Sequence, residues 1–438
     1  MLSLHSGGGI GGLCLAVALS RYPDIQVDVY EAAERFKEIG AGVMIWSRTW
    51  EILTLLGMAS DFSQIAHATP DGSLGVGFDY RKSDQPEGSQ FYLFELPYGC
   101  IRFHRAQFLD VLVKHLPKDV AHFRKRLLSY SQEASDGHLD LQFQDGSTVT
   151  CDLLVGCDGI KSGVRRQMLK EKAQAGQADL LRLIEPVWTG TIAYRGLIPV
   201  HRLIRADGQE HRTIQTPMMV ARSLHMPKSS AQHVVSYSIS RGSVVNVVAL
   251  VSRPEQEGAP YEGPWVTDCS AQELHECYAG WEPEVVDLIK CIENPTRWAI
   301  HHLRPLPFYT TDRVVLLGDA AHAMSPHQGA GAGQAIEANP CHQDAFVLAR
   351  VLGDPVTTMS TLRHAISAYE YVRLPQANRV LLGSHISGMM YEFDGPAQVD
   401  LQRLGPMIGA QWDWLNETTP EEEGRRALSW MQDRIESL

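Results

Sequence analysis

The sequence has no long apolar run, no basic start and no excess of basic residues. It contains no stretch of about 18 consecutive apolar residues, so we expect no membrane-spanning helix. A glycine cluster begins by Gly7, which does not fit a secretory signal peptide. Lys and Arg together number 39, against 51 Asp and Glu. This acidic balance argues against a nucleic-acid partner, although a few buried arginines can still hold a small anionic ligand.

Cysteine is scarce and scattered, with eight residues and no C-x-x-C pair. In a chain of 438 residues this pattern is typical of buried thiols in a reducing compartment. It does not indicate a disulfide framework or a zinc site. We therefore expect a cytosolic protein that holds no metal. The eight residues are Cys14, Cys100, Cys151, Cys157, Cys269, Cys277, Cys291 and Cys341.

The N-terminal segment has the pattern of a β-α-β unit. A short apolar stretch runs into Gly7-Gly8-Gly9-Ile10-Gly11-Gly12, and residues 13–21 are apolar and favour a helix. Residues 26–30 then predict a strand that ends at Glu31. Strand, helix and strand within about 30 residues are typical of a parallel α/β sheet.

The glycine spacing Gly7-x-Gly9-x-x-Gly12 predicts a dinucleotide site. One glycine permits a tight turn, the next lets the backbone approach a pyrophosphate, and the last lets the helix pack closely on the strand. The phosphates then lie at the positive end of the helix. Glu31 stands 19 residues after Gly12, where its carboxylate can accept hydrogen bonds from ribose hydroxyls.

Two later segments place a Gly-Asp or Asp-Gly pair after a predicted strand. The first is Cys157-Asp158-Gly159-Ile160, and the second is Leu317-Gly318-Asp319-Ala320-Ala321-His322. Doubly wound sheets bind ligands at the carboxyl ends of their strands, where such carboxylates would stand. The glycines that follow, Gly329, Gly331 and Gly333, would let the backbone approach a flat ring closely.

The middle of the chain changes character and predicts an antiparallel sheet. Residues 187–197, 233–239 and 243–251 alternate in polarity or are β-branched. Asp145-Gly146 between two apolar stretches predicts a hairpin. The chain from residue 360 onward is mostly helical in pattern. Taken together, the patterns predict an α/β fold of Rossmann type with an inserted β-rich domain and a helical C-terminal tail.

With these three segments in this order, the chain resembles the group A, single-component FAD-dependent aromatic hydroxylases. The likeness covers nearly the whole chain and is greatest for salicylate-hydroxylase-like members, fungal ones among them. It implies a discontinuous FAD-binding domain from residues 1–70, 99–180 and 300–375. It implies a substrate domain from residues 71–98 and 181–299, followed by a C-terminal helical segment over 376–438.

The resemblance also implies which residues hold the cofactor. Gly7, Gly9, Gly12 and Glu31 would bind the ADP half of FAD, non-covalently. Asp158 would lie near the pyrophosphate and the passing nicotinamide cofactor, and Asp319 near the ribityl or pyrophosphate region. The further contacts expected with FAD come from Arg105 in Phe103-His104-Arg105, Gly42 in Gly40-Ala41-Gly42-Val43, and the backbone at Gly331 and Ala332.

Two residues of the middle region are the catalytic candidates that the resemblance suggests. Arg195 stands in Ala193-Tyr194-Arg195-Gly196, and Tyr237 in Val235-Ser236-Tyr237-Ser238. A fixed cation lowers the pKa of a phenol and orients it, and a tyrosine hydroxyl can hydrogen-bond the same oxygen. A salt bridge for Arg195 and a core position for Tyr237 are the alternatives. We also considered Trp46 and Arg48 as residues that line the site.

The activity implied is hydroxylation of a phenolic or aromatic acid. NADH or NADPH would reduce FAD, and the reduced flavin would trap O₂ as a C4a-hydroperoxide that the electron-rich ring attacks. A dearomatising hydroxylase, an epoxidase and a flavoprotein-like scaffold without turnover are the alternatives. The sequence leaves open the substrate, the choice of NADH or NADPH, and the oligomeric state, for which a homodimer is the assembly to test.

Two departures from the family pattern make an impaired protein an alternative. Only six residues precede Gly7, so we expect the first strand to be nearly absent. The segment Asn339-Pro340-Cys341-His342-Gln343 interrupts the pattern of a long helix. Pro340 is expected to break or kink that helix, because proline lacks the backbone donor and clashes with the preceding turn.

Overall fold

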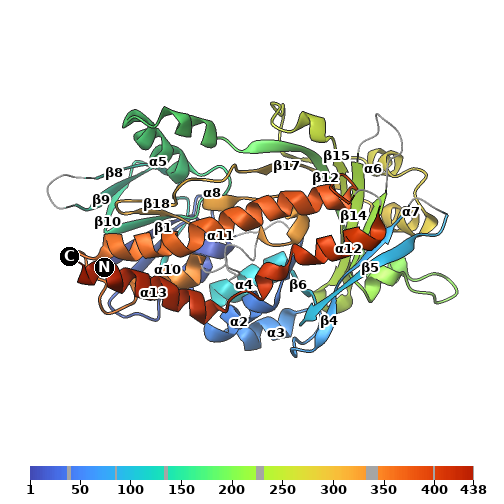
Figure 1. Ribbon diagram of the computed structural model, residues 1–438, viewed down its shortest axis with the longest axis horizontal. Helices are drawn as coiled ribbons and strands as arrows, with labels where there is room; N and C mark the ends of the chain where they lie inside the picture. Colours follow the sequence, from blue (N-terminus) through green and yellow to red (C-terminus); the bar gives the residue numbers. More distant parts are fainter. Residues whose placement is uncertain are drawn as a thin grey trace.

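The computed structural model describes residues 1–36, 41–83, 86–132, 137–222, 231–331, 344–397 and 400–437. Two sheets form the two ends of the molecule, and the long helix α11 (Leu362–Tyr391) runs along both of them (Figure 1). The N- and C-termini lie close together at the end occupied by the six-stranded sheet. Among the described residues, no helix combines the length and the apolar character needed to cross a membrane.

The first sheet has six strands in the order β18-β19-β11-β1-β2-β7. All neighbours are parallel except β18 and β19. Helix α1 (Ile10–Leu19) is buried along its whole length, because it packs against the sheet and against α4 and α10. The strands are β1 (Leu2–Ser6), β2 (Gln26–Tyr30), β7 (Ala121–His122), β11 (Leu153–Gly156), β18 (Thr310–Thr311) and β19 (Val314–Leu316).

The first strand is present, so the expectation that it is nearly absent is wrong. β1 pairs with β2 from Leu2 to Ser6, and with β11 from Ser3 to Ser6. Ladder hydrogen bonds use only backbone groups, so the polar residues at the end of β1 do not prevent pairing once a strand lies on each side. The centre of the sheet is therefore continuous.

The second sheet has eight strands in the order β16-β17-β12-β15-β14-β13-β4-β5. Only the β13–β4 pair is parallel, which agrees with the expected β-rich insertion. The strands are β4 (Leu74–Lys82), β5 (Ser89–Pro97), β12 (Val187–Pro199), β13 (Met218–Arg222), β14 (Ala231–Ile239), β15 (Val244–Ser252), β16 (Val266–Asp268) and β17 (Thr296–His302).

The two faces of this sheet belong to two different cores. Val234 and Val245 pack on one face with Leu274 and Leu288, which come from helices α6 (Ala271–Cys277) and α7 (Pro283–Lys290). Tyr237, on the other face, belongs to the core shared with the six-stranded sheet. Successive side chains of a strand point to opposite faces, so this alternation directs one set of β14 side chains towards the first sheet.

Smaller elements complete the fold, and the expected hairpin is confirmed. Strands β9 and β10 pair on either side of Gly146, whose φ of 82° suits a tight turn. The helix that follows β6 begins at Arg105, because residues 101–104 pair with strand β3. These elements are β3 (Gly42–Ile45), β6 (Ile101–His104), β8 (Leu127–Gln132), β9 (Leu139–Phe143), β10 (Thr148–Cys151), α2 (Ser47–Leu55), α3 (Ala59–Ile65), α4 (Arg105–His115), α5 (Gly163–Gln174) and α8 (Asp319–His322).

The C-terminal part is helical, as the sequence predicts. Helices α10 (Asp344–Leu352), α11, α12 (Leu401–Ala410) and α13 (Pro420–Glu436) pack on one another and on both sheets. The domain limit expected at 375/376 falls inside the continuous helix α11. The break expected at Pro340 lies outside the described residues.

Candidate active site

The glycine-rich turn between β1 and α1 faces open space on one side and packed backbone on the other. A Cβ atom at Gly12 would lie 2.3 Å from the carbonyl oxygen of Gly7, and one at Gly7 would lie 2.3 Å from that of Cys157. At Gly9, the N-cap of α1, a Cβ atom would meet nothing within 4 Å. Among the described residues, no side chain caps this end of α1, which suits an anion such as a pyrophosphate at the positive end of the helix.

Glu31 lies directly beside this turn. Its carboxylate accepts hydrogen bonds from the backbone N–H groups of Gly8 at 2.8 Å and Ala33 at 2.7 Å. The strand β2 therefore delivers the acidic residue to the glycine turn, as the β-α-β spacing predicts.

Asp158 caps the helix that follows it. Its carboxylate accepts hydrogen bonds from the Ser162 hydroxyl at 2.5 Å and from the backbone N–H groups of Gly163 at 2.7 Å and Val164 at 3.2 Å. Burial raises the pKa of Asp158, while these hydrogen bonds oppose the rise. The side chain thus fixes the turn between β11 and α5.

Arg165 connects this turn to the Gly318-Asp319 segment. Its guanidinium donates to the carbonyl oxygens of Ile160 at 2.6 Å, Ile184 at 3.2 Å and Ala320 at 2.9 Å. Burial lowers the pKa of Arg165 to about 10, which still leaves the side chain charged at neutral pH. Two segments far apart in the sequence are therefore held at the same sheet edge by one buried cation.

Asp319 begins α8 just after Gly318, whose φ of 63° lies in the left-handed region. Its side chain is open to solvent, yet protein surrounds it closely enough for loss of water to raise its pKa. The charge of Arg105 is the largest influence that opposes this rise. Within the described residues, a Cβ atom at Gly331 would meet nothing within 4 Å. Ala332 lies outside the described residues.

A buried carboxylate that sequence reasoning did not single out supports the Gly318 turn. Asp344, at the start of α10, accepts hydrogen bonds from Gly318 N–H at 2.9 Å and from His322 Nε2 at 2.7 Å. Its other oxygen lies 2.7 Å from Nε and 2.6 Å from Nη2 of Arg373. Burial alone would raise the pKa of Asp344, but Arg373 and His322 hold it below its ordinary value.

The face of β12 and β14 that points towards the first sheet carries Arg195 and Tyr237. In the strand register, Tyr237 stands opposite Asn246 of β15, and Arg195 stands opposite Val248 of the same strand. The Arg195 guanidinium lies over the ring of Trp298, 4.6 Å from its centre. Burial lowers the pKa of Arg195, the nearby Tyr237 opposes the change, and the charge of Arg105 adds to it.

Gly42 lies against Asn246 and Tyr237 on this face of the sheet. Its N–H donates to Asn246 Oδ1 at 2.9 Å, and a Cβ atom at Gly42 would lie 2.7 Å from the Tyr237 ring. Within the described residues, Asn246 Nδ2 and Arg195 Nε are buried and have no hydrogen-bond partner. Buried donors without acceptors are costly, so this face is suited to a ligand that carries oxygen acceptors.

A second polar group, also missed from the sequence, lies farther along β14. The rings of His233 and His327 are 5.2 Å apart, and His233 Nδ1 lies 3.0 Å from Glu392 Oε1. Burial, together with the charges of neighbouring histidines, holds the pKa of His327 well below its ordinary value. The sequence offers one indication of His327: it stands two residues before Gly329, the first of the three glycines expected to approach a flat ring.

Comparison with known proteins identifies the family. The chain matches the family model described as an FAD binding domain over residues 6–234 and 276–384.

The chain belongs to this FAD-binding family.

Relatives extend the likeness over the whole chain. A salicylate hydroxylase of Pseudomonas putida is 37% identical over 434 residues, which cover 97% of this chain and 94% of that protein. A 6-methylsalicylate 1-monooxygenase of Aspergillus terreus is 35% identical and covers 98% of this chain and 92% of its own length. A solved structure of a salicylate hydroxylase substrate complex has a TM-score of 0.83 at 31% identity, covering 98% of each chain.

These findings confirm the resemblance drawn from the three segments. This member of the FAD-binding family is a salicylate-hydroxylase-like, FAD-dependent monooxygenase, and neither the scaffold alternative nor the dearomatising alternative is favoured. Its own residues fit the cofactor. Among the described residues, no side chain caps the start of α1, and a Cβ atom at Gly9 or Gly331 would meet no atom within 4 Å, so neither position obstructs a ligand.

Two side chains that we considered as site residues have other contacts in this flavoprotein. Trp46 is fully buried among Phe78, Phe94 and Trp412, and its ring N–H donates to the Gln328 carbonyl at 3.1 Å. Arg48 forms a buried ion pair at 3.2 Å with Glu423 of α13. Trp46 therefore supports the turn before Gly329, and Arg48 joins α2 to the C-terminal helix.

Proposed function

We propose that this chain hydroxylates a phenolic carboxylic acid of the salicylate type, with O₂ and NADH or NADPH as co-substrates. The observation that carries the proposal is the polar face of β12, β14 and β15. There, a buried guanidinium and a buried amide have donors without acceptors among the described residues, next to the segments that would hold FAD. The names of the relatives support the same class of substrate.

Arg195 and Tyr237 are the residues that we propose to hold the substrate. Arg195 remains cationic although burial lowers its pKa, because a guanidinium titrates far above neutral pH. A fixed cation binds a carboxylate or phenolate oxygen and favours its ionised form. Burial raises the pKa of Tyr237, so its hydroxyl keeps its proton and can donate it to the same oxygen.

The cofactor would supply the redox chemistry, and the protein would position the substrate. When bound, FAD would supply electron transfer from NAD(P)H and the activation of O₂. Gly9, Glu31 and Asp319 are proposed to bind FAD, with Arg105 and the backbone at Gly42 and Gly331 to 332. Asp158 is proposed to lie near the path of the nicotinamide cofactor. The chain would orient the phenol, keep it ionised and exclude water from the reaction.

The histidine pair is the other polar end of the same sheet face. His233 and Tyr237 are four residues apart on β14, which corresponds to roughly 13 Å along a strand. One small aromatic acid cannot reach both ends. Within the described residues, His233 Nε2 and His327 Nδ1 are buried without a hydrogen-bond partner, so this end can also receive a polar group. Comparing variants at the two ends therefore tests where the acid binds.

The experiment is NAD(P)H oxidation by the FAD-loaded protein, with and without a panel of phenolic acids that includes salicylate. We expect one acid to stimulate oxidation and to yield a hydroxylated product. Arg195→Met should raise KM for that acid by at least about tenfold, because a charge-assisted hydrogen bond is lost. His327→Asn, at the other end, should change KM less. No stimulation by any acid would contradict the proposed activity.

Comparing Arg195→Met with His327→Asn shows which end of the sheet face binds the acid, independently of whether the protein is active. If His327→Asn raises KM and Arg195→Met does not, the substrate binds at the histidine end and the role given to Arg195 is wrong. The flavin absorbance of both variants must match that of the parent protein, so that a loss of FAD is not read as a loss of substrate binding.

The proposed location is the cytosol. The assembly to test is a homodimer. Seven described cysteines are free thiols, which fits a reducing compartment. Light scattering coupled to gel filtration measures the assembly directly.

A further inference from the structure

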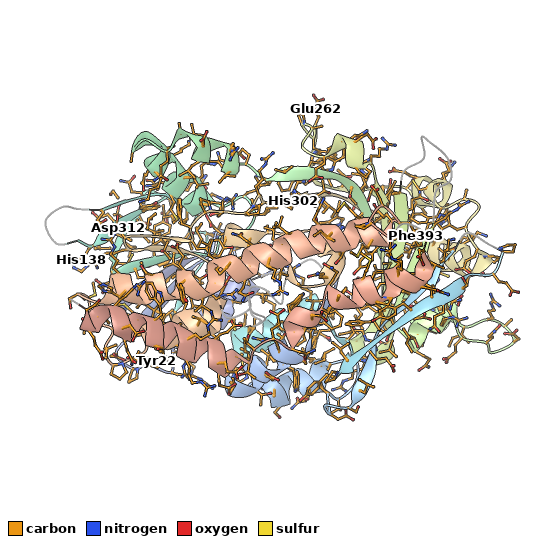
Figure 2. The ribbon with its side chains drawn as sticks, viewed as in Figure 1. Tyr22, His138, Glu262, His302, Asp312 and Phe393 are labelled. Atoms are coloured by element: carbon orange, nitrogen blue, oxygen red, sulfur yellow. The ribbon has the colours of Figure 1, made fainter. Side chains whose placement is uncertain are left out.

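Three side chains with metal-binding atoms meet beside α11, away from the glycine turns. Glu257 follows a short helical turn after β15, His302 ends β17, and His385 lies on α11. Glu257 Oε1 lies 3.3 Å from His302 Nε2, and Glu257 Oε2 lies 3.9 Å from His385 Nε2. All three ligand atoms lie within 4.8 Å of one another. Figure 2 labels His302 near the edge of α11.

We propose that Glu257, His302 and His385 bind a divalent transition metal ion of the Zn²⁺ class. Two imidazoles and one carboxylate form a common ligand set for Zn²⁺, whereas Mg²⁺ and Ca²⁺ prefer oxygen ligands alone. Bonds of about 2.1 Å from Zn²⁺ place tetrahedral ligands about 3.4 Å apart. The 3.3 Å between Glu257 and His302 is close to that value, and the 3.9 Å from the other oxygen of Glu257 to His385 is longer, so the His385 side chain would move closer when the ion binds.

The charges around the three residues also suit a cation. A hydrogen bond from His302 holds the pKa of Glu257 below its ordinary value, so the carboxylate is charged at neutral pH. Arg304 is the nearby cation that would oppose a metal ion, and its Nη1 instead donates to the Arg182 carbonyl at 3.2 Å.

The backbone holds Glu257 in place without any ion. Gly190 has a φ of 76° in the bulge of β12, and a Cβ atom there would lie 2.2 Å from the Arg253 carbonyl oxygen. Gly258, next to Glu257, donates its N–H to the Trp188 carbonyl at 2.9 Å. His302 is fixed by its pairing with Val187 in the sheet. Two of the three ligands are thus preorganised, which lowers the cost of binding.

Exposure leaves a path for the ion. The side chain of His302 is 11% exposed, and those of Glu257 and His385 are each 34% exposed. The metal would be reached from solvent and could keep a water molecule as its fourth ligand. It would join β17 and the loop after β15 to α11, whose Gly388 packs on His327. The expected effect is a more stable junction between sheet and helix, whatever the activity of the enzyme.

The ligands could not be found from sequence spacing. They come from three elements far apart in the chain and form no short motif, and the scattered cysteines, from which no metal is expected, are not among them. Neither the FAD segments nor Arg195 and Tyr237 belong to this cluster. The proposed metal site can therefore stand or fail independently of the proposed function.

The test uses the FAD-loaded protein after removal of metals with a chelator. Calorimetric titration with Zn²⁺ should show one ion per chain, and Zn²⁺ should raise the melting temperature. Glu257→Gln, His302→Gln and His385→Gln should each weaken binding by at least about tenfold, the smallest loss expected for a changed ligand. His364→Gln, on the same helix but outside the cluster, is the matched control and should bind as the parent does.

Cobalt distinguishes this site from the thiols of the chain. Co²⁺ at two imidazoles and a carboxylate should give visible absorption without a thiolate charge-transfer band, and this readout needs only the parent protein. A thiolate band at one equivalent would overturn the proposal. So would the absence of stoichiometric Zn²⁺ binding, or unchanged binding in all three ligand variants. Circular dichroism and flavin content confirm that each variant is folded.

Discussion

Asp344→Asn is the change that most directly tests how the Gly318-Asp319 turn is held. Asp344 is fully buried and accepts three hydrogen bonds, from Gly318 N–H, His322 Nε2 and Arg373 Nε, and it forms an ion pair with Arg373. An asparagine keeps the shape but removes the charge, so Arg373, which is also fully buried, loses its ion pair with Asp344. Breaking one side of a buried ion pair costs about 3–5 kcal/mol. For a cooperative unit of 150–250 residues that is a fall of roughly 6–20 °C in melting temperature.

The pH dependence of the effect has a definite sign. The pKa of Asp344 is lowered in the folded protein, so the charge stabilises the fold above the unfolded pKa of about 4. That stabilisation is lost as the pH falls through the lower, folded pKa. The difference in stability between the parent and Asp344→Asn should therefore be largest near neutral pH and shrink in acid.

Thermal unfolding followed by circular dichroism, with flavin fluorescence for FAD affinity, measures both consequences. The matched control is Glu417→Gln on the exposed pair Arg379–Glu417, whose two contacts are 2.6 Å each. An exposed pair contributes about 1 kcal/mol at most. If Asp344→Asn destabilises no more than this control and leaves FAD affinity unchanged, the reasoning from the buried network is refuted.

Three further changes follow from the same geometry. Gly9→Ala should leave the apoprotein's melting temperature nearly unchanged but weaken FAD binding, measured by fluorescence titration, because its Cβ meets only open space. Gly12→Ala should lower both the melting temperature and FAD binding, since its Cβ would meet the Gly7 carbonyl at 2.3 Å; an unaltered variant would contradict this. Arg48→Met should cost up to about 3–5 kcal/mol in urea unfolding because the buried Glu423 loses its ion pair with Arg48, and Arg48→Met with Glu423→Leu should recover most of it.

The glycine turn and its acid could be predicted because their constraints are local. The spacing of Gly7, Gly9 and Gly12 encodes one turn and one helix contact, and the short β-α-β connection places Glu31 beside them. The β-branched runs of the middle region likewise predict strands without knowledge of their partners. The family resemblance added the order of the segments, and the relatives confirm it.

The first strand shows why a local pattern can mislead. Its residues are polar near the end, and a strand judged by side chains alone is weak. The pairing with β2 and β11 depends on backbone groups that come from residues 26–30 and 153–156. Tertiary context therefore decides an element that the sequence of five residues does not.

The residues that sequence reasoning missed are those whose roles depend on contacts across the chain. The role of Asp344 follows from its hydrogen bonds with Gly318 and Arg373, and that of Asn246 from its hydrogen bond with Gly42. A lone Asp or Asn in a helix or strand is common on surfaces. Only burial with unmet or shared hydrogen bonds separates these residues from such cases, and burial is a property of the folded chain.

Helix α11 connects the Gly318-Asp319 turn with the histidine end of the β14 face. Arg373 supports Asp344 and thereby the Gly318 turn, while Ser384 donates to the Ser325 carbonyl at 2.5 Å. One turn further on, a Cβ atom at Gly388 would lie 2.5 Å from the His327 ring. The segment that follows β19 is therefore held at both ends by one rigid helix. Because packed helices shift as units, a change at one of these contacts is felt at the other.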